Sequence, residues 1–176
     1  FDNSYIERDI NKSILYFTLA ANQNNIRAQL NLASIYFDGI FIRRDIDEAI
    51  RYLSMAAKQN DKLALFKLGT IYYEGQFVPR DIKKSLHFLN LSASLNFGDA
   101  QAYLGIIYLY GNKYTAPDIN KAIHYFELSA NQNCQIALAN LGIIYLYGNK
   151  YVHHDINKSI HYLTLAANLN CRQSQR

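Results

Sequence analysis

The dipeptide Asp-Ile returns at a nearly fixed interval along this chain of 176 residues, and it constrains the fold more than any other feature. It begins at Asp9, Asp45, Asp81, Asp118 and Asp155, so the successive steps are 36, 36, 37 and 37 residues. A period of this length is typical of a solenoid, in which one supersecondary unit stacks on copies of itself. Solenoids act mainly through extended surfaces, so the repeat favours binding over chemistry at a single reactive site.

A first helical segment is predicted before each of the last four aspartates. Its apolar and small residues stand at offsets 0, 4, 5 and 8, which share one face of an α-helix. The second copy reads Ala64, Leu68, Gly69 and Tyr72. Three residues after each tyrosine comes a glycine, which ends a helix in the left-handed conformation without a β-carbon penalty. These glycines are Gly39, Gly75, Gly111 and Gly148.

A second helix is predicted to begin at each Asp-Ile aspartate, which is well placed as an N-cap. Glu48 lies three residues after Asp45 and approximates a capping box. Each second helix is expected to end at an asparagine, the next-best residue after glycine for a left-handed cap. These asparagines are Asn24, Asn60, Asn96, Asn133 and Asn170. Small pairs such as Ala56-Ala57 follow large aromatics such as Tyr52, an alternation that indicates packed antiparallel helix pairs.

The chain is interpreted as a single repeat domain over residues 1–176. The predicted boundaries are a partial repeat at 1–25, four repeats at 26–61, 62–97, 98–134 and 135–171, and the start of another repeat at 172–176. The loop from glycine to aspartate gains one residue in the last two copies, which accounts for the longer period. Both chain ends fall inside a repeat and the first residue is Phe1, so we expect a fragment of a longer array. The alternative is a protein that starts or stops unsealed.

Composition excludes several classes of protein. The formal charge is +4 without a run of Lys or Arg, so no arm for nucleic acid or membrane is predicted. No apolar stretch is long enough to insert into a membrane. Cys134 and Cys171 are 37 residues apart, at equivalent positions of successive repeats, where a disulfide is not expected. Free thiols and the lack of a visible signal peptide favour a cytoplasmic location.

No residues are predicted to be catalytic or to hold a metal or a cofactor. His87, His124 and His161 occupy equivalent positions, too far apart to share one ion, and His153-His154 has no matching ligand cluster. The aspartates of the Asp-Ile dipeptides are explained by their capping role. No Ser/His/Asp set, phosphate-binding loop or paired carboxylate site is recognisable.

The repeat resembles that of a known family. The pattern Ala-x-x-x-Leu-Gly-x-x-Tyr-x-x-Gly, followed by Asp-x-x-Lys-Ala-x-x-aromatic, is similar to the Sel1-like repeat, a relative of the tetratricopeptide repeat. The match is plainest at residues 64–75 and 118–125 and covers essentially the whole chain. The chain departs from the family in having no Trp, and in having Phe41 and Phe77 where a loop glycine is usual.

The resemblance implies an all-α, right-handed α-solenoid of antiparallel helix pairs, with the first helices on the concave face. It also implies a non-enzymatic scaffold or adaptor for proteins. Carried over from tetratricopeptide geometry, the groove residues are Asn31, Ser34, Phe37 and Asp38; Phe66, Lys67, Thr70, Tyr73 and Glu74; Tyr103, Ile106, Leu109 and Tyr110; and Asn140, Ile143, Leu146 and Tyr147.

The first two groups of groove residues are more polar and the last two are aromatic and aliphatic. A hydrophobic peptide or an amphipathic helix of a protein partner is therefore expected in the groove. The competing interpretation is that these side chains pack on the neighbouring repeat. Two other functions stay open: an RNA-binding helical repeat, which the scarcity of cations in the groove disfavours, and a recruiting arm of a larger enzyme.

Overall fold

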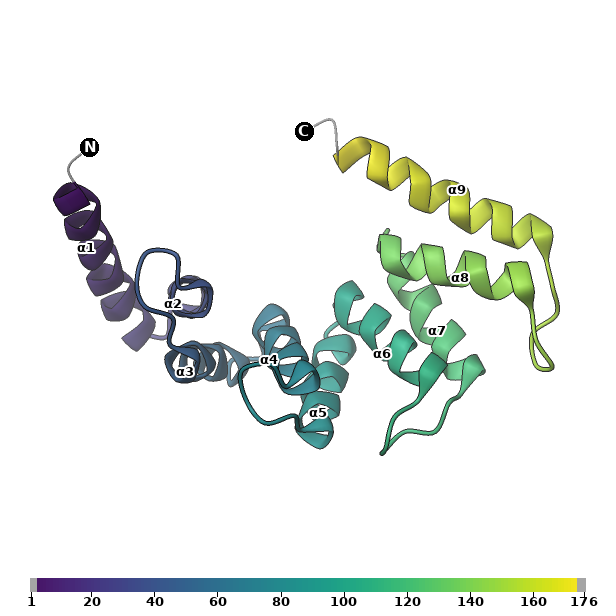
Figure 1. Ribbon diagram of the computed structural model, residues 1–176, viewed down its shortest axis with the longest axis horizontal. Coiled ribbons are helices and arrows are strands. Elements are labelled where there is room, and N and C mark those ends of the chain that lie inside the picture. Colours follow the sequence, from purple (N-terminus) through teal and green to yellow (C-terminus); the bar gives the residue numbers. More distant parts are fainter. Residues whose placement is uncertain (1–2, 174–176) are drawn as a thin grey trace. The chain divides into compact units, whose positions relative to one another are not determined.

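The computed structural model describes the backbone of residues 3–173 and the side chains of residues 9–169. Within these residues the chain forms nine α-helices, and the only paired extended backbone is an isolated bridge between Asn112 and Thr115 (Figure 1). The predicted all-α class is confirmed. The helices are α1 (Asn3–Asn22), α2 (Ile26–Asp38), α3 (Ile46–Ala57), α4 (Lys62–Glu74), α5 (Ile82–Ser94), α6 (Gly98–Tyr110), α7 (Ile119–Ala130), α8 (Gln135–Tyr147) and α9 (Ile156–Gln173).

The helices form two compact units, Phe1–Ser92 and Ala93–Arg176. In the first unit α2 packs against both α1 and α3, and α3 packs against α4. In the second unit α7 packs against both α6 and α8, and α8 packs against α9. Figure 1 shows α8 and α9 side by side and joined by one loop, so they form an antiparallel hairpin. Alternating first and second helices therefore build each unit.

The aspartates of the Asp-Ile dipeptides cap the second helices and also close the preceding loops. A side-chain oxygen of Asp45 accepts the N–H of Glu48 at 3.0 Å, and Asp81, Asp118 and Asp155 accept the equivalent amides. The backbone N–H of Asp45 donates to the carbonyl of Tyr36, also at 3.0 Å. The same backbone bond recurs from Asp81 to Tyr72, from Asp118 to Tyr108 and from Asp155 to Tyr145. The predicted caps are confirmed at these four positions.

The N-cap predicted at Asp9 is wrong. Helix α1 runs without a break from Asn3 to Asn22, so the amides after Asp9 bond to helical carbonyls and need no cap. The Asp9 carbonyl itself accepts a hydrogen bond from the Ser13 hydroxyl at 2.8 Å. The helix end predicted at Asn170 is also wrong, because α9 continues to Gln173.

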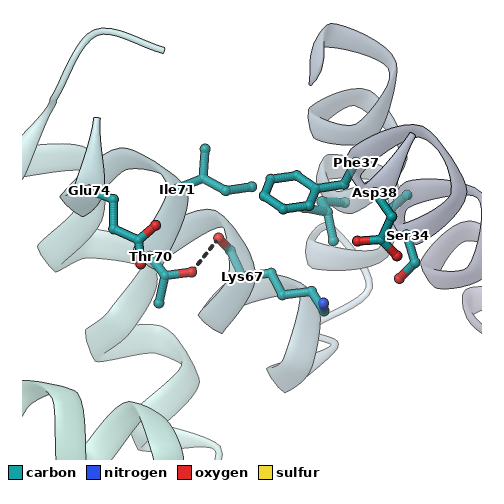
Figure 2. Close-up of a pocket in the computed structure, with 9 residues that line it drawn as sticks. Ser34, Phe37, Asp38, Lys67, Thr70, Ile71 and Glu74 are labelled. Atoms are coloured by element: carbon teal, nitrogen blue, oxygen red, sulfur yellow. Dashed lines mark hydrogen bonds between the residues drawn. The ribbon is translucent and has the colours of Figure 1, made fainter. Parts of the chain in front are cut away.

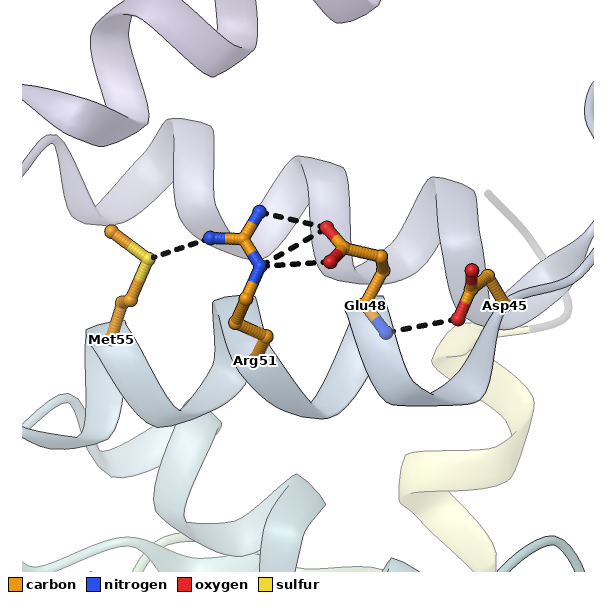
Figure 3. Close-up of polar contacts among 4 residues, drawn as sticks. All are labelled: Asp45, Glu48, Arg51 and Met55. Carbon is orange, nitrogen blue, oxygen red and sulfur yellow. Dashed lines mark hydrogen bonds and ion pairs between the residues drawn. The ribbon is translucent and has the colours of Figure 1, made fainter.

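The capping box expected between Asp45 and Glu48 does not form (Figure 3). The N–H of Asp45 is already donated to Tyr36, so it is not available to the Glu48 carboxylate. Glu48 instead accepts two-pronged hydrogen bonds from Arg51, the shortest at 2.7 Å. This hydrogen bonding raises the pKa of Arg51 above its usual range. The pair is exposed, so it adds little to stability.

The helix-ending residues fall into two groups. Asn24, Asn60, Asn96 and Asn133 have φ between 57° and 63°, the left-handed conformation predicted for them. Gly39 and Gly75 are also left-handed, with ψ of 25° and 23°. Gly111 and Gly148 keep a positive φ but have ψ of 178° and −175°, so the left-handed cap predicted there is wrong. The extra loop residue redirects the chain through a backbone conformation that is essentially restricted to glycine.

Small residues of the first helices let the second helices approach closely. A β-carbon on Gly69 would lie 2.7 Å from Cγ of Leu89, and one on Gly105 would lie 2.6 Å from the Phe126 ring. Phe126 is fully buried, and so is Leu89. The predicted alternation of small and large residues is therefore how first and second helices pack.

An aromatic pair joins the two helices of every repeat. The pairs are Tyr36–Tyr52, Tyr72–Phe88, Tyr108–Tyr125 and Tyr145–Tyr162, with ring centroids 5.5–6.0 Å apart and planes within 13°. A cation lies over one ring of each pair; for example, Lys158 is 4.8 Å from the Tyr145 centroid. Each stacked pair is worth about 1 kcal/mol beyond its burial.

Candidate binding surfaces

A cavity of about 270 Å³ lies in the first unit between the first helices α2 and α4 (Figure 2). Its floor is apolar and includes Ala33, Leu53 and Ile71. The remaining lining side chains are Ser34, Phe37, Asp38, Lys67, Thr70 and Glu74, all of which sequence analysis assigned to a groove. The structure thus brings residues of two successive repeats together around one cavity. Its volume would accommodate a few side chains.

Charged groups of both signs line this cavity. The carboxylates of Asp38 and Glu74 are at equivalent positions of their repeats, and neither forms an ion pair among the described residues. The Lys67 side chain extends across the cavity towards Ser34 and Asp38 (Figure 2). The Thr70 hydroxyl donates to the carbonyl of Lys67 at 2.9 Å, which fixes its orientation. The cavity therefore offers an apolar floor with both a donor and acceptors at its walls.

A second cavity of about 220 Å³ lies on the other side of α2. It is lined by Phe17 of α1, by Asn31, Ser34, Ile35 and Asp38 of α2, and by the loop residues Ile40 and Phe41. Ser34 and Asp38 belong to both cavities, so one helix presents the same polar pair to two hollows. Ile40 and Phe41 are 75% and 62% exposed, which is unusual for such large apolar side chains.

The other groove residues predicted on α4 lie outside these two cavities. Phe66 and Tyr73 are half-buried. The guanidinium of Arg80 lies 5.0 Å from the centre of the Tyr73 ring, so this ring already contacts its own unit.

The predicted groove residues of the second unit are unevenly exposed. Ile106 and Leu109 pack against the core of the unit, and Tyr103 is half-buried. The Asn140 amide donates to the carbonyl of Ile136 at 2.8 Å, and Leu146 is half-buried. In contrast, Tyr110, Ile143 and Tyr147 are 72%, 49% and 78% exposed. The exposed side chains of this set are thus Tyr110 and Tyr147 at the ends of α6 and α8, and Ile143 within α8.

Sequence reasoning missed the loop aromatics. The ring of Phe77 meets that of Phe37 edge-on at 5.5 Å, and the guanidinium of Arg44 lies 5.0 Å from the Phe77 centroid. Phe37 is a wall residue of the larger cavity, so the loop after α4 supports that wall. The available signal was the replacement of an expected loop glycine by a large aromatic at Phe41 and Phe77.

The model of the Sel1 repeat matches the chain at residues 2–25, 26–61, 62–97, 98–134 and 135–171. The chain belongs to the Sel1 repeat family. Members of this family are generally modules for protein–protein interaction and typically form non-catalytic scaffolds. No curated protein sequence matches the chain significantly.

Solved Sel1 repeat structures resemble this chain over most of its length. A Sel1 repeat protein from Oxalobacter formigenes is 30% identical with a TM-score of 0.81, over 88% of this chain and 62% of that protein. The antigen c5321 of uropathogenic Escherichia coli is 29% identical with a TM-score of 0.79, over 88% of this chain and 33% of that protein. The chain therefore spans only about three fifths and one third of the length of these two relatives.

The fold extends to more distant proteins. Cysteine rich protein B of Helicobacter pylori has a TM-score of 0.61 at 24% identity, over 77% of this chain and 97% of that protein.

Cys134 of the present Sel1 protein is a free thiol, 3.9 Å from a carboxylate oxygen of Asp99, and the Cys171 side chain lies outside the described residues.

The described part of this Sel1 protein shows neither a metal cluster nor a membrane span. No three His, Cys, Asp or Glu side chains gather there in a way that suits a metal ion. His87, His124 and His161 are exposed, and each lies edge-on against the ring of the next residue in the chain. None of the described helices combines the length and apolar character that crossing a membrane requires.

Proposed function

We propose that this Sel1 repeat chain is a non-enzymatic module that binds an extended or helical segment of a partner protein along its first helices. The observation that carries the proposal is the cavity between α2 and α4, whose walls come from two successive repeats and include two pairs of equivalent positions, Ser34 with Thr70 and Asp38 with Glu74. An apolar floor with a few polar groups around it is typical of sites that recognise side chains of a peptide.

Two further features support peptide binding in the first unit. The cavities on either side of α2 share Ser34 and Asp38, so a segment that crosses this helix would meet both hollows. The carboxylates of Asp38 and Glu74 are free to accept hydrogen bonds from a partner backbone or side chain. Such groups orient a peptide, whereas the apolar floor supplies the favourable burial.

The test is selection of peptides from a random display library on the intact chain, followed by titration of each selected peptide in solution. Ser34→Arg places a long charged side chain at a position that lines both cavities, and is expected to weaken the binding of peptides to the first unit by tenfold or more. Asn90→Arg is the matched control, because Asn90 is exposed on the second helix α5. Circular dichroism on both variants checks that they remain folded.

Two results would count against this function. Failure to select any peptide that binds the folded chain contradicts peptide recognition altogether. Equal binding of all selected peptides to the wild type and to Ser34→Arg removes the cavities beside α2 as the binding site.

A further inference from the structure

The second unit contains the same run of residues twice. Residues 104–114 and residues 141–151 both read Leu-Gly-Ile-Ile-Tyr-Leu-Tyr-Gly-Asn-Lys-Tyr. The residues next to each run differ: Tyr103 and Thr115 flank the first run, and Asn140 and Val152 flank the second. The identical run thus covers the end of each first helix and the first part of the loop, and identity resumes where the second helices begin, as Asp-Ile-Asn-Lys at residues 118–121 and 155–158.

Packing explains only part of this identity. The leucine, the first glycine and the second isoleucine of each run are buried in the core of the unit. The second tyrosine, the lysine and the last tyrosine are exposed in both runs. These exposed residues are Tyr110, Lys113 and Tyr114 in one repeat and Tyr147, Lys150 and Tyr151 in the next. The two sets are called the tyrosine–lysine surface below.

Hydrogen bonds fix the backbone of the two turns that carry the lysines and the last tyrosines. The Asn112 side-chain oxygen accepts the N–H of Tyr114 at 2.8 Å, and that of Asn149 accepts the N–H of Tyr151 at 2.8 Å. A second backbone bond closes each turn, from Asn112 to Thr115 and from Asn149 to Val152.

The lysines lie over aromatic rings of their own turns. The ammonium groups of Lys113 and Lys150 are 5.6 Å and 4.7 Å from the centroids of Tyr114 and Tyr151. A cation held in this way loses less conformational freedom when it pairs with a ligand. The surface therefore presents two positioned cations, one in each repeat.

No acidic residue balances these cations within the runs or the loops. There is none between Asp99 and Asp118, and none between Glu127 and Asp155. Neither Lys113 nor Lys150 forms an ion pair among the described residues. In the first unit, by contrast, the positions equivalent to Tyr110 and Tyr147 are Asp38 and Glu74. The positions that hold carboxylates in the first unit thus hold neutral tyrosines in the second.

We propose that the tyrosine–lysine surface binds an acidic segment of a partner protein. Aspartate or glutamate side chains of the segment pair with Lys113 and Lys150, and its apolar or aromatic side chains pack on Tyr110 and Tyr147. The phenolic O–H groups of these tyrosines donate further hydrogen bonds to carboxylates. This assignment rests on the proposed function, to which it adds the chemistry of the partner.

A nucleic acid fits the same surface less well. A nucleic acid carries one charge per nucleotide, and its affinity grows with the number of phosphates that the protein neutralises. One lysine per repeat neutralises few of them. A segment that alternates carboxylates with apolar side chains matches a surface that alternates single cations with pairs of exposed tyrosines.

The experiment uses the intact chain and a library of random peptides about 15 residues long. Peptides selected on the wild type are expected to contain a subset enriched in Asp or Glu beside large apolar residues. This subset should bind the double variant Lys113→Met, Lys150→Met at least tenfold more weakly, and should weaken with added salt. The matched control is Lys12→Met, Lys58→Met, which removes the same charge from exposed sites of the first unit and should leave their affinity unchanged.

The outcomes separate the two proposals. Selected peptides without acidic enrichment, or with equal affinity for the wild type and the lysine double variant, overturn the acidic partner and leave peptide binding in place. Selection of no peptide at all overturns both. A single-stranded dT oligonucleotide that binds more tightly than every selected peptide, and loses affinity in the lysine double variant, assigns the surface to nucleic acid and also overturns the proposal.

Discussion

The side-chain amide of Gln132 donates a 2.7 Å hydrogen bond to the amide oxygen of Gln101 across the two helices of one repeat. Gln59 and Gln29 make the same bond at 2.9 Å in the first full repeat. In the other two repeats both positions are leucine, as Leu65 with Leu95 and Leu138 with Leu169. In the four full repeats the two positions are thus either both glutamine or both leucine.

This pairing predicts strong coupling between the two positions. Gln132→Leu alone removes the donor to the Gln101 oxygen, and Gln101 is only 3% exposed, so we expect a loss of about 1–2 kcal/mol in the free energy of unfolding. Replacing both glutamines by leucine should recover most of that loss, as in the repeats that carry leucine at both positions. Urea denaturation of the single variants and the double variant measures the coupling.

A control for this cycle lies in the same chain. Gln23 occupies the position of Gln132 in the partial repeat at residues 1–25. Its side chain is exposed and makes no described hydrogen bond. Gln23→Leu should therefore change stability by less than about 0.5 kcal/mol. Strictly additive effects of Gln101→Leu and Gln132→Leu would show that the hydrogen bond does not couple the pair.

The Asp-Ile aspartates predict a contrast between one copy and the others. Asp118→Ala removes an N-cap whose side chain accepts the N–H of Lys121 at 3.0 Å, and should destabilise the chain by about 1 kcal/mol. Asp118→Asn keeps a capping oxygen and should be much milder. Asp9→Ala changes the same dipeptide inside the continuous helix α1, so it should be nearly neutral. Equal destabilisation by Asp118→Ala and Asp9→Ala in thermal melts would contradict the capping role.

These aspartates also show how far the sequence carried the prediction of the fold. The repeated spacing of apolar residues identified the helices, because every copy has nearly the same pattern of buried positions. A prediction made from what the copies share misses the features in which one copy differs. It failed at Asp9 and at Asn170, where one copy differs from the rest, and at Gly111 and Gly148, where two copies differ from the other two. A motif shared by all copies carries no information about such a difference, which depends on what surrounds each copy in the folded chain.

The candidate site was predictable to a smaller extent. The residues around the larger cavity follow from the outward-facing positions of the first helices, so Ser34, Lys67 and Thr70 were expected together. The contribution of the loops was not, because Phe41 and Phe77 have no counterpart in the helical pattern. The exposure of Tyr110 and Tyr147 was likewise not separable from core packing without the positions of neighbouring side chains.

The stacked tyrosines predict a loss of stability at alkaline pH. Burial raises the pKa of Tyr125 and Tyr162 above the usual value, and burial with the nearby Glu127 does the same for Tyr145. Tyrosines of the unfolded chain ionise at about pH 10, before those of the folded chain, so ionisation stabilises the unfolded state. The free energy of unfolding should therefore be constant below about pH 9 and fall as the pH rises through 10 and above.

Phenylalanine provides the matched variant for this prediction. Phe88 already occupies the position of Tyr125 and Tyr162 in another repeat and stacks on Tyr72 in the same way. The double variant Tyr125→Phe, Tyr162→Phe should keep the stacks but lose less stability between about pH 9 and pH 11. Urea midpoints across this range, with tyrosinate absorbance to follow ionisation, make the comparison. An unchanged alkaline loss in the variant would assign it to other groups.

The contact between Gly105 and Phe126 predicts a second coupled pair. Alanine at 105 would place its β-carbon 2.6 Å from a rigid, fully buried ring, and overpacking of this kind costs about 1–3 kcal/mol. Alanine gains up to about 1 kcal/mol of helix propensity over glycine, so the clash should prevail and Gly105→Ala should destabilise the chain.

In the first full repeat the equivalent residues are Ala33 and Leu53, both buried, which shows that alanine is accepted opposite leucine. A β-carbon on Gly69 would also lie 2.7 Å from Leu89, but a leucine side chain can shift where a rigid ring cannot. Phe126→Leu should therefore relieve the alanine variant, with a favourable coupling of about 1 kcal/mol in a double-mutant cycle. If Gly105→Ala is as stable as the wild type, the two helices are not held at the close distance that this packing requires.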